Sequence, residues 1–178
     1  FDKDPDRDRN MNHLILLAEN MTGYKNLTKI VSAAFTEGFY FKPRVDKELL
    51  REHSEGIICL SACLAGAIPR KILNGDYSGA KAEALELRDI FGKDNFYLEI
   101  QNHFLDDDKP ATQGLVRLSE EISAPLVATN DAHYIKRSDA KAHDVLLAIQ
   151  TGSTVDDENR MRFANDEFYL CLQITRKL

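Results

Sequence analysis

The chain has 178 residues, of which 43% are hydrophobic and 29% are charged, and its formal net charge is −6. This size and composition are typical of one soluble globular domain with a sizeable core. No apolar run approaches the roughly 20 residues of a membrane-spanning helix, so we expect no membrane partner. An acidic domain of this kind is not expected to bind a nucleic-acid backbone strongly by itself.

The start of the chain, residues 1–12, is highly charged and lacks the apolar core of a secretory signal, and we interpret it as a charged linker. The three cysteines are Cys59, Cys63 and Cys171. They are too few, and odd in number, for a disulfide framework, which favours a reducing compartment. The sequence therefore predicts a cytoplasmic location.

Short apolar runs alternate with helical patterns along the rest of the chain. The runs predict strands at Leu14–Ala18, Ile57–Ser61, Phe96–Ile100 and Leu126–Thr129. The patterns predict helices at Tyr24–Phe35, after Asp46, at Ala65–Leu73, Ser78–Phe91 and Pro110–Ile122, and after Ser138 to Ile149. The first run is continuous, as in a strand covered on both faces. This alternation is typical of parallel βα units, in which polar residues at the strand ends build a shared site.

The stretch Asn130–Tyr134 follows directly on the last predicted strand and contains Asp131 and His133. On extended backbone, alternate side chains point the same way, so both would face one spot at the strand end. A carboxylate and an imidazole that converge there suit a divalent metal with open coordination positions. The alternative is a capping aspartate beside a turn histidine.

Two further residues are candidates for the same site. His13 adjoins the first strand, and Cys63 lies just past the second. A thiolate beside an imidazole and a carboxylate suits zinc. Against this, a lone histidine beside a strand is more often structural, and cysteine is commonly a small buried apolar residue. His13 also precedes its strand, whereas barrel sites gather at the carboxyl ends of strands.

Glu99 and His103 lie in or just past the third strand. They could orient metal ligands from outside the coordination shell, or they could be a polar rim. No catalytic acid, base or nucleophile is identified by the sequence.

Seven blocks of the sequence follow one another in a recognisable order: His13–Asn20, Gly23–Leu27, Glu55–Gly66, Asp94–His103, Leu126–Tyr134, Gln150–Gly152 and Asp156–Phe163. Together they resemble the family of bacterial replicative DNA polymerase III alpha subunits. They cover nearly the whole chain, and several long blocks in the correct order are far more specific than a single short motif.

The resemblance implies an α/β fold, the later part of a polymerase-and-histidinol-phosphatase (PHP) domain. This would be a partial, distorted (β/α)7 barrel that lacks its first strands, over residues 13–150, with 151–178 starting the passage toward the polymerase palm. The metal ligands that it implies are His13, Cys63, Asp131 and His133. Some family members use the site as a metal-dependent 3′–5′ exonuclease, and others keep it as a scaffold. The implied cofactor is Zn or Mn in the PHP site, with Mg in the palm, which this sequence does not contain.

The implied parent protein is a DNA-directed DNA polymerase of DNA replication. Its partners would be DNA, dNTPs and replisome subunits, including a proofreading exonuclease or a sliding clamp. The opening His-x-His, Asp-His and glutamate motifs of the family have no counterpart here, so we expect this fragment to be inactive or weakly active and to self-associate through uncovered barrel edges. The alternatives are a free-standing PHP phosphoesterase that acts on a phosphate monoester and a non-catalytic scaffold module.

Overall fold

The computed structural model describes residues 11–170. The predicted linker at 1–12 therefore lies almost wholly outside the described residues, as does Cys171. The elements in chain order are β1 (Ile15–Ala18), α1 (Met21–Thr36), α2 (Lys47–Glu52), β2 (Ile57–Leu60), α3 (Ala67–Leu73), α4 (Tyr77–Phe91), β3 (Phe96–Ile100), α5 (Asp108–Ile122), β4 (Leu126–Ala128), a 3₁₀ turn (Arg137–Asp139) and α6 (Ala140–Gln150).

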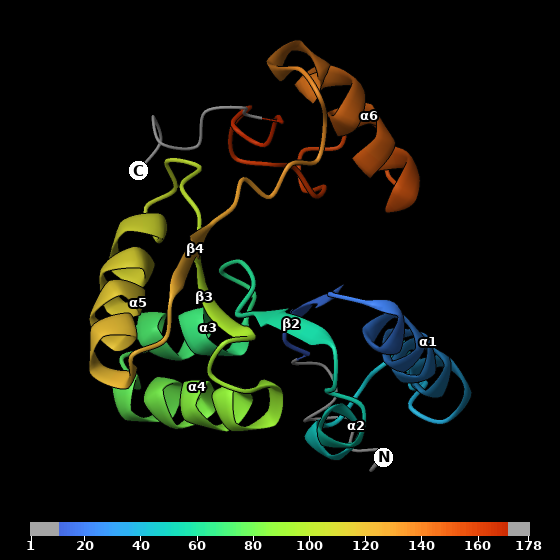
Figure 1. Cartoon of the computed structure of the whole chain (residues 1–178). Helices are drawn as coiled ribbons and strands as arrows, with labels where there is room; N and C mark the ends of the chain where they lie inside the picture. Colours follow the sequence, from blue (N-terminus) through green and yellow to red (C-terminus); the bar gives the residue numbers. More distant parts are fainter. Residues whose placement is uncertain (1–10, 171–178) are drawn as a thin grey trace.

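The strands form one sheet in the order β1-β2-β3-β4 (Figure 1). The strands β2, β3 and β4 run parallel to one another, and β1 runs antiparallel to β2. The predicted α/β class is confirmed, because an open, mostly parallel sheet with helices packed on it is consistent with part of a PHP-type barrel. The carboxyl ends of β3 and β4 point toward the side of the molecule where α6 lies (Figure 1).

The first strand differs from its prediction. We expected a strand covered on both faces, but β1 is at the edge of the sheet, where Ile15 and Leu17 are 39% and 48% exposed. The run is apolar throughout because Leu14 and Leu16 pack against the core from alternate positions. This apolar run therefore belongs to a strand with one buried face and one exposed face. The sequence pattern alone does not distinguish such a strand from one that is buried on both faces.

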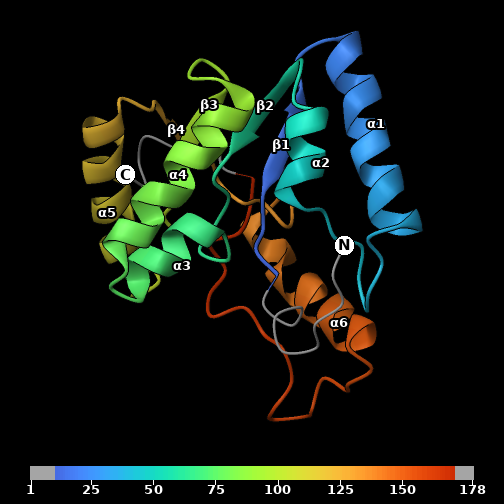
Figure 2. The ribbon, with the colours of Figure 1, turned by 90° about the horizontal axis from the view of Figure 1, so that it is seen from below.

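Helices α3, α4 and α5 cover one side of the sheet, as Figures 1 and 2 show from two directions. The core between them contains alternate residues of β2 and β3, among them Ile57, Cys59, Phe96 and Leu98, all with 0% exposure. The side of α4 that faces this core consists of its buried residues Ala80, Ala84, Leu87, Ile90 and Phe91. Alternating strand residues therefore put one set of side chains into the core and leave the other set for the opposite side.

The start of α6 also differs from its prediction. Ser138 was expected to cap this helix, but it lies inside the 3₁₀ turn that precedes it. Asp139 is at the N-cap position of α6 but makes no side-chain capping bond to it; its carboxylate instead accepts a hydrogen bond of 2.9 Å from the Lys136 backbone N–H, before the 3₁₀ turn. Asp and Ser are equally good caps, so the adjacent pair could not be resolved from residue type. Among residues 11–170, no helix has the length and apolar character that a membrane span requires.

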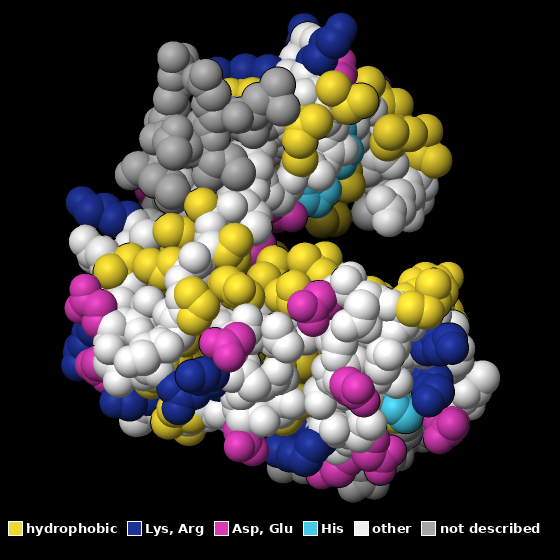
Figure 3. All heavy atoms as spheres, viewed as in Figure 1, with side chains coloured by type: hydrophobic (Ala, Val, Ile, Leu, Met, Phe, Trp, Pro, Cys, Tyr) yellow, Lys and Arg dark blue, Asp and Glu magenta, His cyan; other side chains and the backbone are white. Residues whose placement is uncertain are grey.

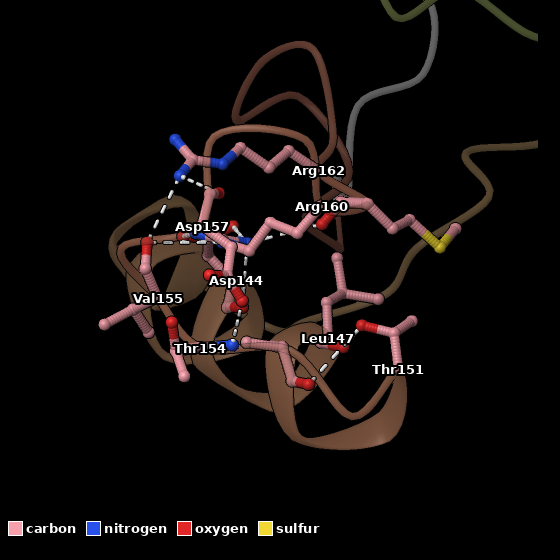
Figure 4. Close-up of polar contacts among 10 residues, drawn as sticks. Asp144, Leu147, Thr151, Thr154, Val155, Asp157, Arg160 and Arg162 are labelled. Carbon is pink, nitrogen blue, oxygen red and sulfur yellow. Dashed lines mark hydrogen bonds and ion pairs between the residues drawn. The ribbon is translucent and has the colours of Figure 1, made fainter.

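An ion pair between Arg160 and the exposed carboxylate of Asp144 joins α6 to the segment that follows it (Figure 4). The Arg160 side chain is 2% exposed, and its guanidinium donates to both carboxylate oxygens of Asp144, at 2.7 and 2.5 Å. It also donates to the carbonyl of Val155 at 3.3 Å. A two-pronged contact of this kind fixes geometry as well as charge, so the irregular segment is held against the helix.

This pair predicts a stability change in acid. The hydrogen bond from Arg160 lowers the pKa of Asp144 below its usual 3.8. Because the folded-state pKa is lowered, the contribution is complete above the unfolded value and is lost as the pH falls through the folded value. We expect the melting temperatures of the wild type and of Asp144→Asn to differ by a constant amount above about pH 5 and the difference to shrink as the pH falls below 3.8. A difference that grows as the pH falls would contradict this.

The exposed edge of the sheet predicts self-association. Within the described part of the chain, no strand pairs with the outer edge of β1. Open edges with apolar side chains are templates for pairing with another chain. We expect a concentration-dependent dimer in sedimentation velocity across the micromolar range, and we expect Leu17→Lys to shift it toward monomer without lowering the melting temperature. A wild-type chain that is monomeric throughout this range would rule the pairing out.

Candidate metal centre

The antiparallel direction of β1 accounts for the position of His13. The pairing of Ile15 with Leu60 puts the start of β1 beside the end of β2. Just before β1, His13 forms an isolated parallel bridge with Gly66, and its backbone N–H donates to the carbonyl of Ala65 at 3.1 Å. A histidine that precedes its strand therefore lies at the carboxyl edge of the parallel strands, where sites of such folds form.

His13 meets Cys63 at this edge. The distance from the His13 Nδ1 atom to the Cys63 Sγ atom is 3.6 Å. Zinc bonds of about 2.3 Å to sulfur and 2.0–2.1 Å to nitrogen, at a tetrahedral angle, separate the two ligand atoms by about 3.5 Å. The pair therefore has the spacing of two ligands on one zinc ion, although a hydrogen bond between thiol and imidazole has a similar length. The donor set and its spacing both fit a soft divalent metal.

The charges around Cys63 come from neighbouring strand ends. Burial raises the pKa of the half-buried Cys63 thiol, and the negative charges of Asp131 and Glu99 raise it further. The charge of Asp131, 68 residues further along the chain, thus acts on this sulfur. These influences disfavour the thiolate, so a cation beside the sulfur would be needed to stabilise the form that binds metal.

His133 has a defined tautomer. Its Nδ1 atom lies 2.8 Å from the carbonyl oxygen of Asp131, and a carbonyl can only accept, so Nδ1 carries the proton. The neutral ring then presents an Nε2 lone pair, which is the form of histidine that ligates metals. Asp131 itself has a φ of 43°, in the left-handed region that aspartate tolerates better than most residues. The backbone is therefore a tight turn here, not the extended strand end that the sequence predicted.

The ring of His133 packs in an aromatic cluster with α6 and the segment after it. It lies edge-on to Phe163, with ring centroids 4.7 Å apart, and its centroid is 5.7 Å from that of His143. Burial lowers the pKa of His143, and the neighbouring His133 lowers it further. In Figure 3 the surface is hollowed between α6 and the part formed by β1 and α1, and histidine side chains are visible on the α6 side.

The four predicted ligands are thus brought together only in part. His13 and Cys63 are in contact, and Asp131 acts on Cys63 through its charge, whereas His133 belongs to the aromatic cluster. Within residues 11–170, no three His, Cys, Asp or Glu side chains are arranged to hold one metal ion. Ligation of a metal by all four residues therefore stays a prediction.

Glu99 is a buried carboxylate next to this edge, with 5% exposure. Its Oε1 atom accepts hydrogen bonds from the side chains of Thr129 and of Gln101, the latter at 3.0 Å. Its Oε2 atom has no hydrogen-bond partner in the described part of the chain. A small cavity of about 10 Å³ is lined by Glu99 and Cys63 among others. Sequence reasoning missed the supporting residues Gln101 and Thr129, although both lie just past the ends of β3 and β4.

A larger groove of about 660 Å³ is also lined by His13. It is bordered by Arg44, Asp46 and Glu83, with an apolar floor that includes Leu50 and Ile68. Cys63, Asp131 and His133 do not line it, so its size does not identify it as the metal site.

Comparisons with known proteins identify the family of the chain. The sequence model of the PHP domain matches residues 2–103. The chain is 49% identical over 158 residues to "DNA polymerase III subunit alpha" of Borreliella burgdorferi and 50% identical over 158 residues to the same subunit of Thermus aquaticus. It is 46% identical over 165 residues to the same subunit of Deinococcus radiodurans.

These matches cover 89–93% of this chain but only 12–14% of each relative. The chain thus spans about one seventh of the length of the curated relatives that it matches. The model match covers more than half of the chain and includes both His13 and Cys63. The expected family is confirmed, and the chain belongs to the PHP domain family.

Proposed function

We propose that this chain is the metal-binding PHP part of a bacterial replicative DNA polymerase III alpha subunit. The observation that carries this proposal is the contact of His13 with Cys63 at the carboxyl edge of the sheet, at a distance that suits two ligands of one metal ion. The relatives named DNA polymerase III subunit alpha support the parent protein. The parent would copy DNA from dNTPs with other replisome subunits, and residues from about 151 onward would lead toward its palm.

The residues that would hold the metal are His13, Cys63, Asp131 and His133. His13 and Cys63 supply an imidazole and a thiol from adjacent ends of β1 and β2. Asp131 and His133 supply a carboxylate and an Nε2 lone pair from the turn after β4. A soft sulfur with nitrogen ligands favours zinc, and the carboxylate also suits manganese.

The chemistry that a bound divalent cation supplies is a water of lowered pKa and stabilisation of charge on phosphoryl oxygens. This chain's own residues would hold the ligand atoms at the edge of the sheet, and the Asp131 carbonyl would accept the hydrogen bond that keeps the proton on Nδ1 of His133. Glu99 and His103 would lie outside the coordination shell and help to orient the ligands. With these four ligands alone, we expect binding of metal but weak or no phosphodiester hydrolysis and no polymerisation.

The test is zinc and manganese titration of the whole chain by calorimetry, together with incubation of labelled single-stranded DNA and of a small phosphate monoester. Metal binding without hydrolysis of either substrate is the expected result. Manganese-dependent DNA degradation that His133→Ala abolishes would assign a nuclease instead of a support role. Hydrolysis of the monoester alone would favour a free-standing phosphoesterase, and failure to bind either metal would contradict the proposed site.

A further inference from the structure

The turn that contains Asp131 and His133 is held on both sides by a segment far along the chain. The backbone N–H of His133 donates to the carbonyl of Phe168 at 2.8 Å, and the backbone N–H of Leu170 donates to the carbonyl of Tyr134 at 2.9 Å. The side chain of Asn130, just before the turn, donates to the carbonyl of Tyr169. We call residues 165–169, which provide most of these contacts, the clamp segment.

His103 connects this clamp segment to the turn. It is 3% exposed, and its Nε2 atom lies 2.9 Å from the carbonyl oxygen of Asn130. Because a carbonyl only accepts, Nε2 carries the proton and donates it. The His103 ring also stacks on Phe168, with centroids 4.1 Å apart and planes 10° from parallel. The Asn165 side chain completes the link by donating to the His103 carbonyl at 2.6 Å.

His103 is itself fixed from the side of α5. The buried Asp108 carboxylate accepts hydrogen bonds from the backbone N–H of His103 at 2.7 Å and of Leu105 at 3.0 Å. The backbone of His103 thus contacts the start of α5 and Asn165, and its imidazole contacts Asn130 after β4 and Phe168 of the clamp segment. Such a point of convergence determines where the turn after β4 can lie.

The turn needs this support because Asp131 has a left-handed backbone conformation, which most residue types adopt only at a cost in energy. Asp131 has a φ of 43°, and a non-glycine residue keeps such a conformation when its surroundings over-determine it. The hydrogen bond of Asn130 to His103 lies directly before Asp131, and that of His133 to Phe168 lies two residues after it. Both sides of the turn are therefore fixed through His103 and its stacking partner.

We propose that His103 is a positioning residue for the ligands Asp131 and His133, and that the clamp segment is part of the metal site. The inference rests on the proposed function for the identity of the ligands. Asp131, His133 and the clamp segment all lie outside residues 2–103, which match the PHP model, so this half of the site would lie beyond the matched part of the chain. Formation of the metal site would then depend on the folding of the segment after α6, to which the clamp segment belongs.

The test compares two replacements of His103 in the whole chain. His103→Phe keeps a ring for Phe168 but loses the donor to Asn130, whereas His103→Gln keeps a donor. We expect His103→Phe to weaken zinc binding by about 10- to 100-fold, the range for partners that orient metal ligands, and His103→Gln to recover most of this loss. His53→Gln, at the end of α2, is the matched control and should leave affinity unchanged.

Hydrogen exchange of the His133 backbone N–H provides a second measurement that needs no metal. We expect faster exchange in His103→Phe, because this change loosens the clamp segment. If His103→Phe does not fold, Asn165→Ala serves instead and is expected to have the same effect. Unchanged exchange and unchanged affinity in a folded variant would overturn the inference. A wild type that binds no metal, with exchange at His133 still controlled by His103, would contradict the proposed function and leave the positioning role of His103 supported.

Discussion

Replacement of Cys63 with serine is expected to abolish the thiolate-to-cobalt absorption of a Co²⁺-loaded chain and to weaken zinc binding by at least about 100-fold. Loss of residues that only orient ligands already costs about 10- to 100-fold, and Cys63 would bind directly. Serine is nearly isosteric, but its hydroxyl does not become a ligand anion near neutral pH. Optical titration with Co²⁺, followed by competition with zinc, measures both effects.

The fold should be unaffected by this change, because Cys63 is only half buried and lies past the end of β2. The contrasting variant is Cys59→Ser, in which a hydroxyl would enter the core at 0% exposure. We expect Cys59→Ser to lower the melting temperature and, where folded, to retain the cobalt band. A cobalt band that survives Cys63→Ser and disappears in Cys59→Ser would place the metal elsewhere.

Elements with strong local signals were predictable from the sequence. Strand β3 has the predicted bounds, Phe96–Ile100, because its apolar run is bounded by polar turn residues. Helix α4 ends at Phe91, as predicted, because Gly92 takes a φ of 87°, which favours glycine. Such boundaries depend on a few neighbouring residues, and these are visible in the order of the amino acids.

The direction of β1 was not predictable in this way, because strand direction is a long-range property. The run Leu14–Ala18 reads alike whether it pairs parallel or antiparallel with β2. Only the pairing of Ile15 with Leu60 brings His13 to Cys63. The sequence thus identified two candidate ligands but could not explain their meeting, and the position of His13 before its strand argued against it.

The turn at Asp131 was mispredicted for a related reason. Alternation on extended backbone would point Asp131 and His133 the same way, but the left-handed φ of Asp131 ends the alternation. The partners that hold the turn, His103 and Phe168, lie about 30 residues to either side of it. Apolar periodicity carries no information on such contacts, so the sequence did not identify the clamp segment as a support for the turn.

Replacement of Gly23 with alanine is expected to have the largest effect on stability. A Cβ atom at Gly23 would lie 1.7 Å from the carbonyl oxygen of Gly56, which is backbone and cannot rotate away. That carbonyl accepts the hydrogen bond of 2.9 Å from the Glu19 backbone N–H, so its displacement would also disturb the end of β1. Helix α1 and the start of β2 can approach this closely only with glycine at position 23.

Helix propensity alone would predict the opposite sign, because alanine is favoured over glycine by about 1 kcal/mol in a helix interior. Overpacking in a tight contact costs about 1–3 kcal/mol or more, and a clash with fixed backbone is at the upper end of that range. We therefore expect Gly23→Ala to lower the free energy of unfolding in urea by about 2 kcal/mol or more. Gly75→Ala is the control, since no atom lies within 4 Å of its added Cβ and only the φ of 77° opposes it. A Gly23→Ala chain as stable as the wild type would show that α1 does not pack on β2 through this glycine contact.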